Sequence, residues 1–313
     1  MKIAIIGSSD FGKAVLDAFL DRGDEVVIVC CPPDNPKSTK PDALKLGATE
    51  RGITPLQLPS LKGPELIDTM RNSGAELIVM AYVLQFVPQE LVNSTKYGTI
   101  QYHPSLLPKY RGPSAINWAI ALGETETGLT IFRPSDGMDE GAVILQKTVP
   151  IGPDDTLGEV YFNRLFPVGV SAMLEAADLI VHSKHTETIQ DESLANYEGW
   201  FSSAVAKINW FSHINVTYNL IRAANPAPGA HASYKGQKVQ IYDCRKHLSP
   251  TFKSVKGQPG QISDIQSDSI FVACPGGQIE IIKAKSATGK KDSAAKVAAE
   301  LGIAIGDFFD LET

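Results

Sequence analysis

The 313-residue sequence contains no apolar run that approaches the roughly 20 residues needed to span a bilayer. Its four cysteines show no metal-ligand spacing and no C-x-x-C pair, and the chain also lacks an H-E-x-x-H motif. The N-terminus does not have the layout of a signal peptide. We therefore expect a cytoplasmic protein with reduced cysteines, no bound metal and no membrane association.

The glycine-containing start of the chain lacks the middle glycine of a dinucleotide-binding motif. G-x-G-x-x-G would place glycine where this chain has Ser9, and a side chain there hinders close approach of a pyrophosphate. Gly7 and Gly12 are explained by a tight turn from strand to helix, so we expect no NAD cofactor. Because no G-x-S-x-G surrounds Ser105, this serine is expected to be a hydrogen bonder within its loop and not a nucleophile.

The net charge of −6 is divided unevenly along the chain. Residues 1–199 hold 16 Lys/Arg against 26 Asp/Glu, a net charge of −10, and residues 200–313 hold 13 against 9, a net charge of +4. The acidic first part argues against broad nucleic-acid binding. In the second part the basic residues are scattered, which favours a solvated surface of mixed charge over a polyanionic partner.

Short apolar segments alternate with helical patterns through the first half of the chain. Segment 25–31 contains Val-Val-Ile-Val without a polar residue, which is typical of a strand buried on both faces. The alternation predicts an α/β fold with a doubly wound, mostly parallel sheet, in which ligands bind beyond the carboxyl ends of the strands. A longer helical pattern, 156–183, begins with capping-box spacing at Thr156 and Glu159. The predicted strands are 2–6, 25–31, 53–58, 77–81, 99–103, 127–132 and 142–149.

Residues 185–206 are polar and irregular and are predicted to form a linker. They separate a catalytic domain, residues 1–184, from a smaller domain, residues 207–313. The second domain has short apolar segments with glycine and proline between them, which suggests a small barrel. Its predicted elements are a helix at 211–224 and strands at 230–234, 238–243, 260–265, 269–274 and 279–282.

The most distinctive segment is 101–112, Gln-Tyr-His-Pro-Ser-Leu-Leu-Pro-Lys-Tyr-Arg-Gly, which puts His103 on a loop stiffened by two prolines. A second polar turn, 136–141, lies between two predicted strands and carries Asp139. A histidine and a carboxylate on tight turns just past strands can form an acid–base site. A loop histidine is also often a plain hydrogen-bonded residue, and an aspartate here can form an Asx turn, for which Asp136 is the better candidate.

These two segments, H-P-S-L-L-P-x-x-R-G and D-G-M-D-E-G, resemble those of the formyltransferases that use 10-formyltetrahydrofolate. Within that family the chain is similar to the hydrolase domain of 10-formyltetrahydrofolate dehydrogenase and, less closely, to methionyl-tRNA formyltransferase. The resemblance extends over nearly the whole chain. Shorter matching stretches are 2–7, 85–88, 145–147, 207–210 and 228–230.

The resemblance implies a Rossmann-like catalytic domain, an OB-like β-barrel domain after the linker, and 10-formyltetrahydrofolate as formyl donor. His103 and Asp139 match the family's catalytic pair. His103 would stabilise the charge that forms on the formyl oxygen, and Asp139 would accept a proton from the nucleophile. Arg111 either steadies its loop through carbonyls or a carboxylate, or touches the substrate. The implied folate pocket is lined by Gln85, Phe86 and Val87 and by the turn residues Asp136, Gly137 and Met138.

Gln101 departs from the family pattern, because most members with an amine acceptor carry Asn two residues before the histidine. Glutamine keeps the amide but adds a methylene group. We therefore expect an enzyme that removes the formyl group of 10-formyltetrahydrofolate, transfers it to water or a small amine, and releases tetrahydrofolate. The first alternative is a formyltransferase acting on methionyl-tRNA or a nucleotide-linked amino sugar, with tRNA the less favoured partner. The second is a folate-binding pseudoenzyme.

Overall fold

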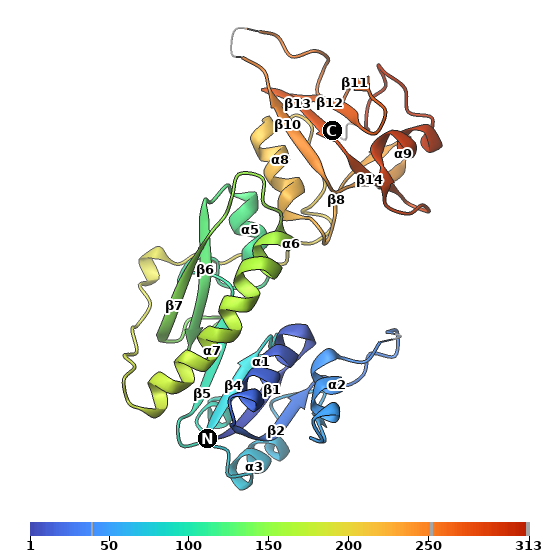
Figure 1. The fold of residues 1–313 in the computed structure, drawn as a ribbon. Helices are drawn as coiled ribbons and strands as arrows, with labels where there is room; N and C mark the ends of the chain where they lie inside the picture. The colour runs from blue at the N-terminus through green and yellow to red at the C-terminus, as the bar shows by residue number, and fades with distance from the viewer. Residues whose placement is uncertain (39, 251–252, 311–313) are drawn as a thin grey trace. The chain divides into compact units, whose positions relative to one another are not determined.

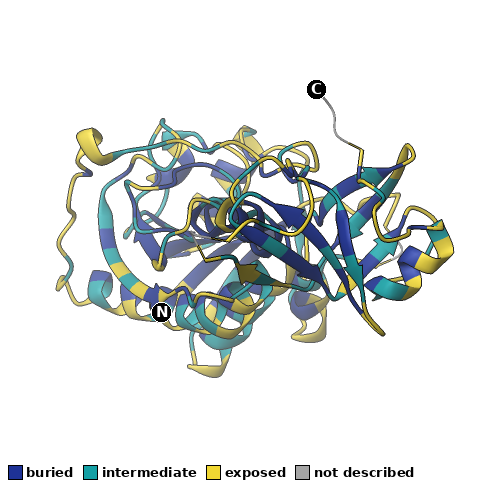
Figure 2. Cartoon of the chain, turned by 90° about the horizontal axis from the view of Figure 1, so that it is seen from above, coloured by how far each residue is buried: buried dark blue, intermediate teal, exposed yellow. Residues whose placement is uncertain are grey.

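The computed structural model describes residues 1–38, 40–250 and 253–310. The chain divides into two compact units, each with its own sheets. In both units the buried residues gather in the strands (Figure 2). The first unit consists of Met1–Pro113, Thr127–Val149 and Phe162–Glu198, and the second of Ser114–Glu126, Pro150–Tyr161 and the chain from Gly199 onward.

The first unit is built on a seven-stranded sheet with the order β3-β2-β1-β4-β5-β6-β7 (Figure 1). The pairs from β3 through to β5 are parallel, and β6 is antiparallel to β5. The strand order reverses between β1 and β4, as in doubly wound sheets. This confirms the predicted α/β fold class. The strands are β1 (Lys2–Gly7), β2 (Glu25–Cys31), β3 (Leu56–Gln57), β4 (Leu77–Ala81), β5 (Thr99–His103), β6 (Glu126–Phe132) and β7 (Val143–Pro150).

The central strands are apolar because both faces of the sheet are covered. Every residue of β4 is buried, as is every residue of β1 after Lys2. On one face α7 packs beside α1, where Gly169 lies against the rings of Phe11 and Tyr102, whose centroids are 4.4 Å apart. The helices of this unit are α1 (Ser9–Asp21), α2 (Ala43–Glu50), α3 (Pro64–Asn72), α4 (Gln89–Val92) and α7 (Phe166–Val181), with a 3-10 turn at Glu192–Leu194.

The long helical pattern predicted over 156–183 forms three consecutive pieces. It begins as α6 (Leu157–Val160), passes through a π-helical turn at Tyr161–Leu165 and continues as α7. The predicted capping box is confirmed. The backbone N–H of Thr156 donates to Oε2 of Glu159 at 2.8 Å, and the Glu159 N–H donates to the threonine hydroxyl at 3.3 Å.

The second unit holds two four-stranded antiparallel sheets, β10-β13-β12-β11 and β15-β14-β9-β8. The chain passes from one sheet to the other at Ile282, which separates β13 from β14. The described residues of this unit therefore form two antiparallel sheets and no closed barrel. The unpredicted β10 is a largely polar edge strand without clear alternation. The strands are β8 (Ala230–Tyr234), β9 (Gln237–Ile241), β10 (Cys244–Leu248), β11 (Ile262–Ile265), β12 (Ile270–Cys274), β13 (Gly277–Ile281), β14 (Lys283–Ser286) and β15 (Asp292–Ser293), and the helices besides α6 are α5 (Ala115–Ala121), α8 (Ile214–Ala223) and α9 (Ala294–Leu301).

Candidate active site

His103 and Asp139 face one another in the first unit. His103 is the last residue of β5, and Asp139 lies in the turn between β6 and β7. Nδ1 of the imidazole lies 3.6 Å from Oδ2 of the carboxylate, and the two side chains are 8% and 12% exposed. The structure thus brings together the two side chains that the sequence assigned to acid–base chemistry, with a little of each open to solvent.

The imidazole of His103 is oriented by its other nitrogen. Nε2 lies 2.8 Å from the carbonyl oxygen of Tyr110, to which it donates. Both ring nitrogens therefore face acceptors, the Tyr110 carbonyl on one side and the Asp139 carboxylate on the other. Nε2 carries the proton of this hydrogen bond, which fixes the orientation of the ring. Because 3.6 Å is longer than a hydrogen bond, Nδ1 is the ring atom that remains available to a substrate.

The loop after His103 is held by hydrogen bonds from neighbouring strands. The Thr130 hydroxyl on β6 donates to the Ser105 carbonyl at 2.7 Å and accepts from the Leu107 N–H at 3.1 Å. Gln146 on β7 donates to the Leu107 carbonyl at 2.8 Å. The Ser105 hydroxyl donates to the Lys109 carbonyl at 2.6 Å, which confirms that it is a hydrogen bonder within the loop.

Asp139 has an unusual backbone conformation for a residue with a side chain. Its φ of +57° lies in the left-handed region, which aspartate tolerates better than most residues do. The Gly112 N–H donates to its Oδ2 at 2.8 Å, so the His103 loop and the aspartate turn are joined directly. The Asp136 carboxylate is exposed and, among the described residues, makes no hydrogen bond, so it forms no Asx turn there.

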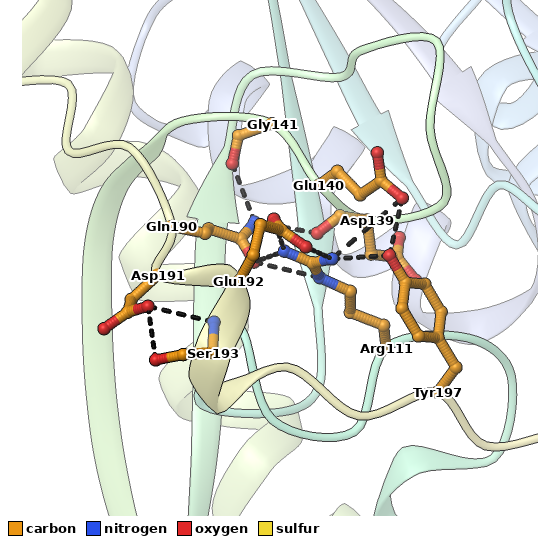
Figure 3. A network of polar contacts seen from close by, with 9 residues as sticks. All are labelled: Arg111, Asp139, Glu140, Gly141, Gln190, Asp191, Glu192, Ser193 and Tyr197. Atoms are coloured by element: carbon orange, nitrogen blue, oxygen red, sulfur yellow. Dashed lines mark hydrogen bonds and ion pairs between the residues drawn. The ribbon is translucent and has the colours of Figure 1, made fainter.

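Arg111 lies at the centre of a group of polar side chains (Figure 3). Its side chain is fully buried and donates to the Gln190 amide oxygen, the Glu192 carboxylate and the Tyr197 hydroxyl. The hydrogen bond to Glu192 raises the pKa of the Arg111 guanidinium and lowers the pKa of the Glu192 carboxyl, so both stay ionised at neutral pH. A hydrogen bond to Glu140 raises the pKa of Tyr197. Arg111 therefore steadies its loop through a carboxylate, one of the two roles expected for it.

Gln101 lies on β5, two residues before His103. Because side chains alternate along a strand, the two residues share one face of the sheet. Gln101 is half-buried, and its strand neighbours are Met80 on β4 and Phe132 on β6. Within the described chain its side-chain amide makes no hydrogen bond, so its donors and acceptor are available to a ligand.

The three residues expected to line the folate pocket after β4 have different surroundings. Phe86 is 50% exposed, whereas Val87 is buried in a core cluster of the first unit. The side-chain oxygen of Gln85 accepts from the Leu61 N–H at 3.3 Å. The structure therefore leaves Phe86 on the surface, keeps Val87 in the core and uses Gln85 to hold a neighbouring loop.

The aspartate turn presents Met138 beside the His103 loop. Met138 is 39% exposed, and its sulfur lies close to Gly112, 3.3 Å from where a Cβ on that glycine would be. A Cβ on Gly137 would lie 1.8 Å from Oε2 of Glu140, so a side chain at this position would require the Glu140 side chain to move. The turn therefore places one apolar side chain next to the histidine–aspartate pair.

A cavity of about 100 Å³ lies where β1, β2 and β4 end. This edge is where parallel α/β sheets bind ligands. Its lining includes Ser8, Cys30, Cys31, Tyr82 and Gln85, but not the histidine or the aspartate described above. Gln85 is the one predicted site residue in this lining.

No group of three or more His, Cys, Asp or Glu side chains in the described ranges is placed to hold a metal ion. None of the helices the structure describes has both the length and the apolar character needed to cross a bilayer.

The chain belongs to the formyltransferase family. The family signature described as Formyl transferase matches residues 1–177, and the one described as Formyl transferase, C-terminal domain, matches residues 202–301. The chain is 39% identical over 247 residues to mitochondrial 10-formyltetrahydrofolate dehydrogenase of Mus musculus, which covers 77% of this chain and 26% of that protein. It therefore spans about a quarter of the length of that relative.

Another relative matches over nearly its whole length. Methionyl-tRNA formyltransferase of Geotalea uraniireducens is 33% identical over 295 residues, covering 93% of this chain and 92% of that protein. Among solved structures, HypX from Aquifex aeolicus in complex with tetrahydrofolic acid has a TM-score of 0.69 at 18% identity, covering 100% of this chain and 51% of that one. WlaRD, a sugar 3N-formyl transferase, has a TM-score of 0.67 at 19% identity, covering 93% and 99%. These two structures show that the fold is shared.

Proposed function

We propose that this chain removes the formyl group of 10-formyltetrahydrofolate and transfers it to water or a small amine, releasing tetrahydrofolate. The observation that carries the proposal is the pairing of His103 with Asp139 at 3.6 Å in a member of the formyltransferase family. The similarity to 10-formyltetrahydrofolate dehydrogenase supports the donor, and Gln101 supports an acceptor other than a large amine.

The chemistry divides between the two residues. Asp139 accepts a proton from the nucleophile as the nucleophile attacks the formyl carbon. Negative charge then grows on the formyl oxygen, where Nδ1–H of His103 donates a hydrogen bond, because Nε2 is committed to Tyr110. One such contact is typically worth about 2.7–4 kcal/mol of barrier. As the carbon–nitrogen bond breaks, the leaving nitrogen takes up the proton that Asp139 accepted from the nucleophile, and formate or a formylated amine is released with tetrahydrofolate.

Exposed apolar side chains on two loops of the first unit suit a flat heterocycle. The loop after β4 exposes Tyr82, Leu84 and Phe86, and the aspartate turn exposes Met138. Aromatic and sulfur-containing side chains form walls for such ligands, while backbone groups fix their orientation. Large apolar residues exposed on two loops of a single unit are consistent with a binding surface.

The test is to incubate the protein with 10-formyltetrahydrofolate, with and without candidate small amines, and to follow tetrahydrofolate, formate and formylated amine. We expect steady turnover in at least one condition. If the protein binds the folate tightly without turnover under all conditions, it is the pseudoenzyme and the proposal fails.

Transfer to methionyl-tRNA is the second candidate. It is favoured by the similarity to methionyl-tRNA formyltransferase across nearly the whole chain and by the net charge of +4 over residues 200–313. A gel shift with charged initiator tRNA at several salt concentrations tests it, because phosphate contacts make affinity steeply salt-dependent. If no shift occurs at low salt, this candidate is removed.

A further inference from the structure

The stretch after α7 attaches to both active-site loops of the first unit. We name residues 187–198 the clamp segment. At its start, Thr188 and Val143 exchange backbone hydrogen bonds of 2.8 and 2.9 Å, which fixes it to the beginning of β7. At its end, the Arg111 N–H donates to the Asn196 carbonyl and the Glu198 N–H donates to the Arg111 carbonyl, both at 3.0 Å. The clamp segment therefore runs from the strand after the aspartate turn to the loop after His103.

Gln190 lies between these two anchors with all of its amide hydrogen-bonding capacity in use (Figure 3). Its Nε2 donates to the carbonyl of Asp139 at 2.7 Å and to the carbonyl of Gly141 at 2.8 Å. Its Oε1 accepts from Nε and Nη2 of Arg111 at 3.1 and 2.9 Å. The residue is 6% exposed. Two donors and two accepted bonds are the full set that one amide makes, so its orientation is fixed.

The bonds from Gln190 reach the strained part of the aspartate turn. A non-glycine residue in the left-handed region is strained and persists only where its surroundings hold it. Asp139 is such a residue, and its carbonyl points at the Gln190 amide. At its other end, Oδ2 accepts from Gly112. The aspartate is thus held by its main chain through Gln190 and by its side chain through the His103 loop.

Arg111 sets the direction of the Gln190 amide. It offers two N–H groups to the amide oxygen, so the NH2 group must face the two turn carbonyls. Glu192 and Tyr197 occupy the remaining guanidinium donors. The order of contacts is therefore Glu192 to Arg111, Arg111 to Gln190, and Gln190 to the backbone of Asp139.

We propose that Gln190 is a positioning residue that holds Asp139 at the distance from His103 at which it can accept the proton of the nucleophile. The inference rests on the proposed deformylation or formyl transfer. A misplacement of about 1 Å at a reacting group can lower a rate about a hundredfold. Such a displacement acts on the chemical step, whereas Gln190 makes no hydrogen bond to the loop after β4, which exposes Tyr82, Leu84 and Phe86 of the proposed folate surface.

The variant that isolates this role is Gln190→Glu. It keeps the oxygen that accepts from Arg111 and nearly the same volume, but it replaces the NH2 group by an oxygen that faces two carbonyls. The matched control is Asp191→Asn, which changes charge by one unit on the adjacent residue. Among the described residues the Asp191 side chain accepts hydrogen bonds only from the N–H and hydroxyl of Ser193. An asparagine oxygen can accept both of them. Gln190→Met is the second variant, because it removes the donors without adding a charge.

Steady-state kinetics with 10-formyltetrahydrofolate and the best acceptor are measured for all four proteins, with thermal unfolding and the folded fraction recorded for each. We expect kcat per folded protein to fall at least about tenfold in both Gln190 variants, with KM for the folate within about twofold of wild type. Asp191→Asn should match wild type in both constants.

Wild-type kcat in either folded Gln190 variant overturns the inference and leaves the proposed function standing. A loss that tracks only the folded fraction, or one that is confined to KM, also overturns it. If the wild-type protein shows no turnover with any acceptor, the proposed function fails and the inference fails with it.

Discussion

Nδ1 of His103 lies 3.6 Å from Oδ2 of Asp139, although His103 ends β5 and Asp139 lies in the turn between β6 and β7. The same carboxylate oxygen accepts a 2.8 Å hydrogen bond from the Gly112 N–H. The distance between ring and carboxylate is too long for a hydrogen bond, and each side chain keeps a small exposed fraction. A one-carbon group bound beside the pair would meet the ring nitrogen and the carboxylate together.

Removing either member of the pair should abolish most activity. We expect turnover of 10-formyltetrahydrofolate to fall at least about a hundredfold in His103→Ala and in Asp139→Asn, the scale of positioned acid–base and oxyanion groups. Asp139→Asn keeps an oxygen that accepts from Gly112, so it tests the carboxylate and not the turn. Ser105→Ala is the control, because that hydroxyl bonds only a loop carbonyl and the variant should keep most of the activity. Full activity in either of the first two variants contradicts the assigned roles.

Strands β1, β2 and β4 of the first unit were predictable from local patterns because each contains an unbroken apolar run. The pairing of His103 with Asp139 was predictable mainly because their two segments resemble those of the formyltransferases. The role of Gln190 was not. It lies in a polar segment without periodicity, and its partner Asp139 is 51 residues away in the sequence. Only the folded chain shows that the carbonyls of Asp139 and Gly141 accept hydrogen bonds from the Gln190 amide.

Gln101 is expected to influence the choice of acceptor, since it shares the sheet face of His103 and its side-chain amide is unpaired within the described chain. Gln101→Asn shortens the side chain by one methylene group and gives the asparagine found in most amine-acceptor members of the family. We expect the ratio of formylated amine to formate to rise at least about threefold, roughly 0.7 kcal/mol at 1.4 kcal/mol per tenfold. Gln101→Leu is the control and should leave hydrolysis in place without raising that ratio. A product ratio that is the same in all three proteins contradicts this assignment.

Gly7 is expected to be required by packing and not by a dinucleotide. It ends β1, and a Cβ there would lie 2.2 Å from the Ala81 carbonyl oxygen at the end of β4. Gly7→Ala should therefore push the two strands apart and lower the free energy of unfolding by about 1–3 kcal/mol, measured by denaturant titration. Gly63→Ala is the control, because a Cβ there meets nothing within 4 Å, and we expect a loss below about 1 kcal/mol. Equal losses in the two variants would count against close packing as the reason for this glycine.

Alkaline pH should destabilise the protein through its buried thiols. Burial, with a smaller contribution from Cys31, raises the pKa of the Cys30 thiol to about 12 from the ordinary 9.0. Below pH 9 the thiol is protonated in both states and its contribution is fully present. Between about pH 9 and 12 the unfolded chain loses the proton first, so the free energy of unfolding falls with rising pH by up to about 1.4 kcal/mol per pH unit.

Cys30→Ala should therefore show a shallower decline of stability between pH 9 and 10.5 than wild type, as measured by denaturant titration at several pH values. Val29→Ala, at the preceding buried position of β2, is the matched control. It also leaves a small cavity but removes no ionisable group, so it should lower stability by the same amount at every pH and keep the wild-type slope. Identical slopes in wild type and Cys30→Ala would contradict the prediction that ionisation of the Cys30 thiol causes the loss of stability at alkaline pH.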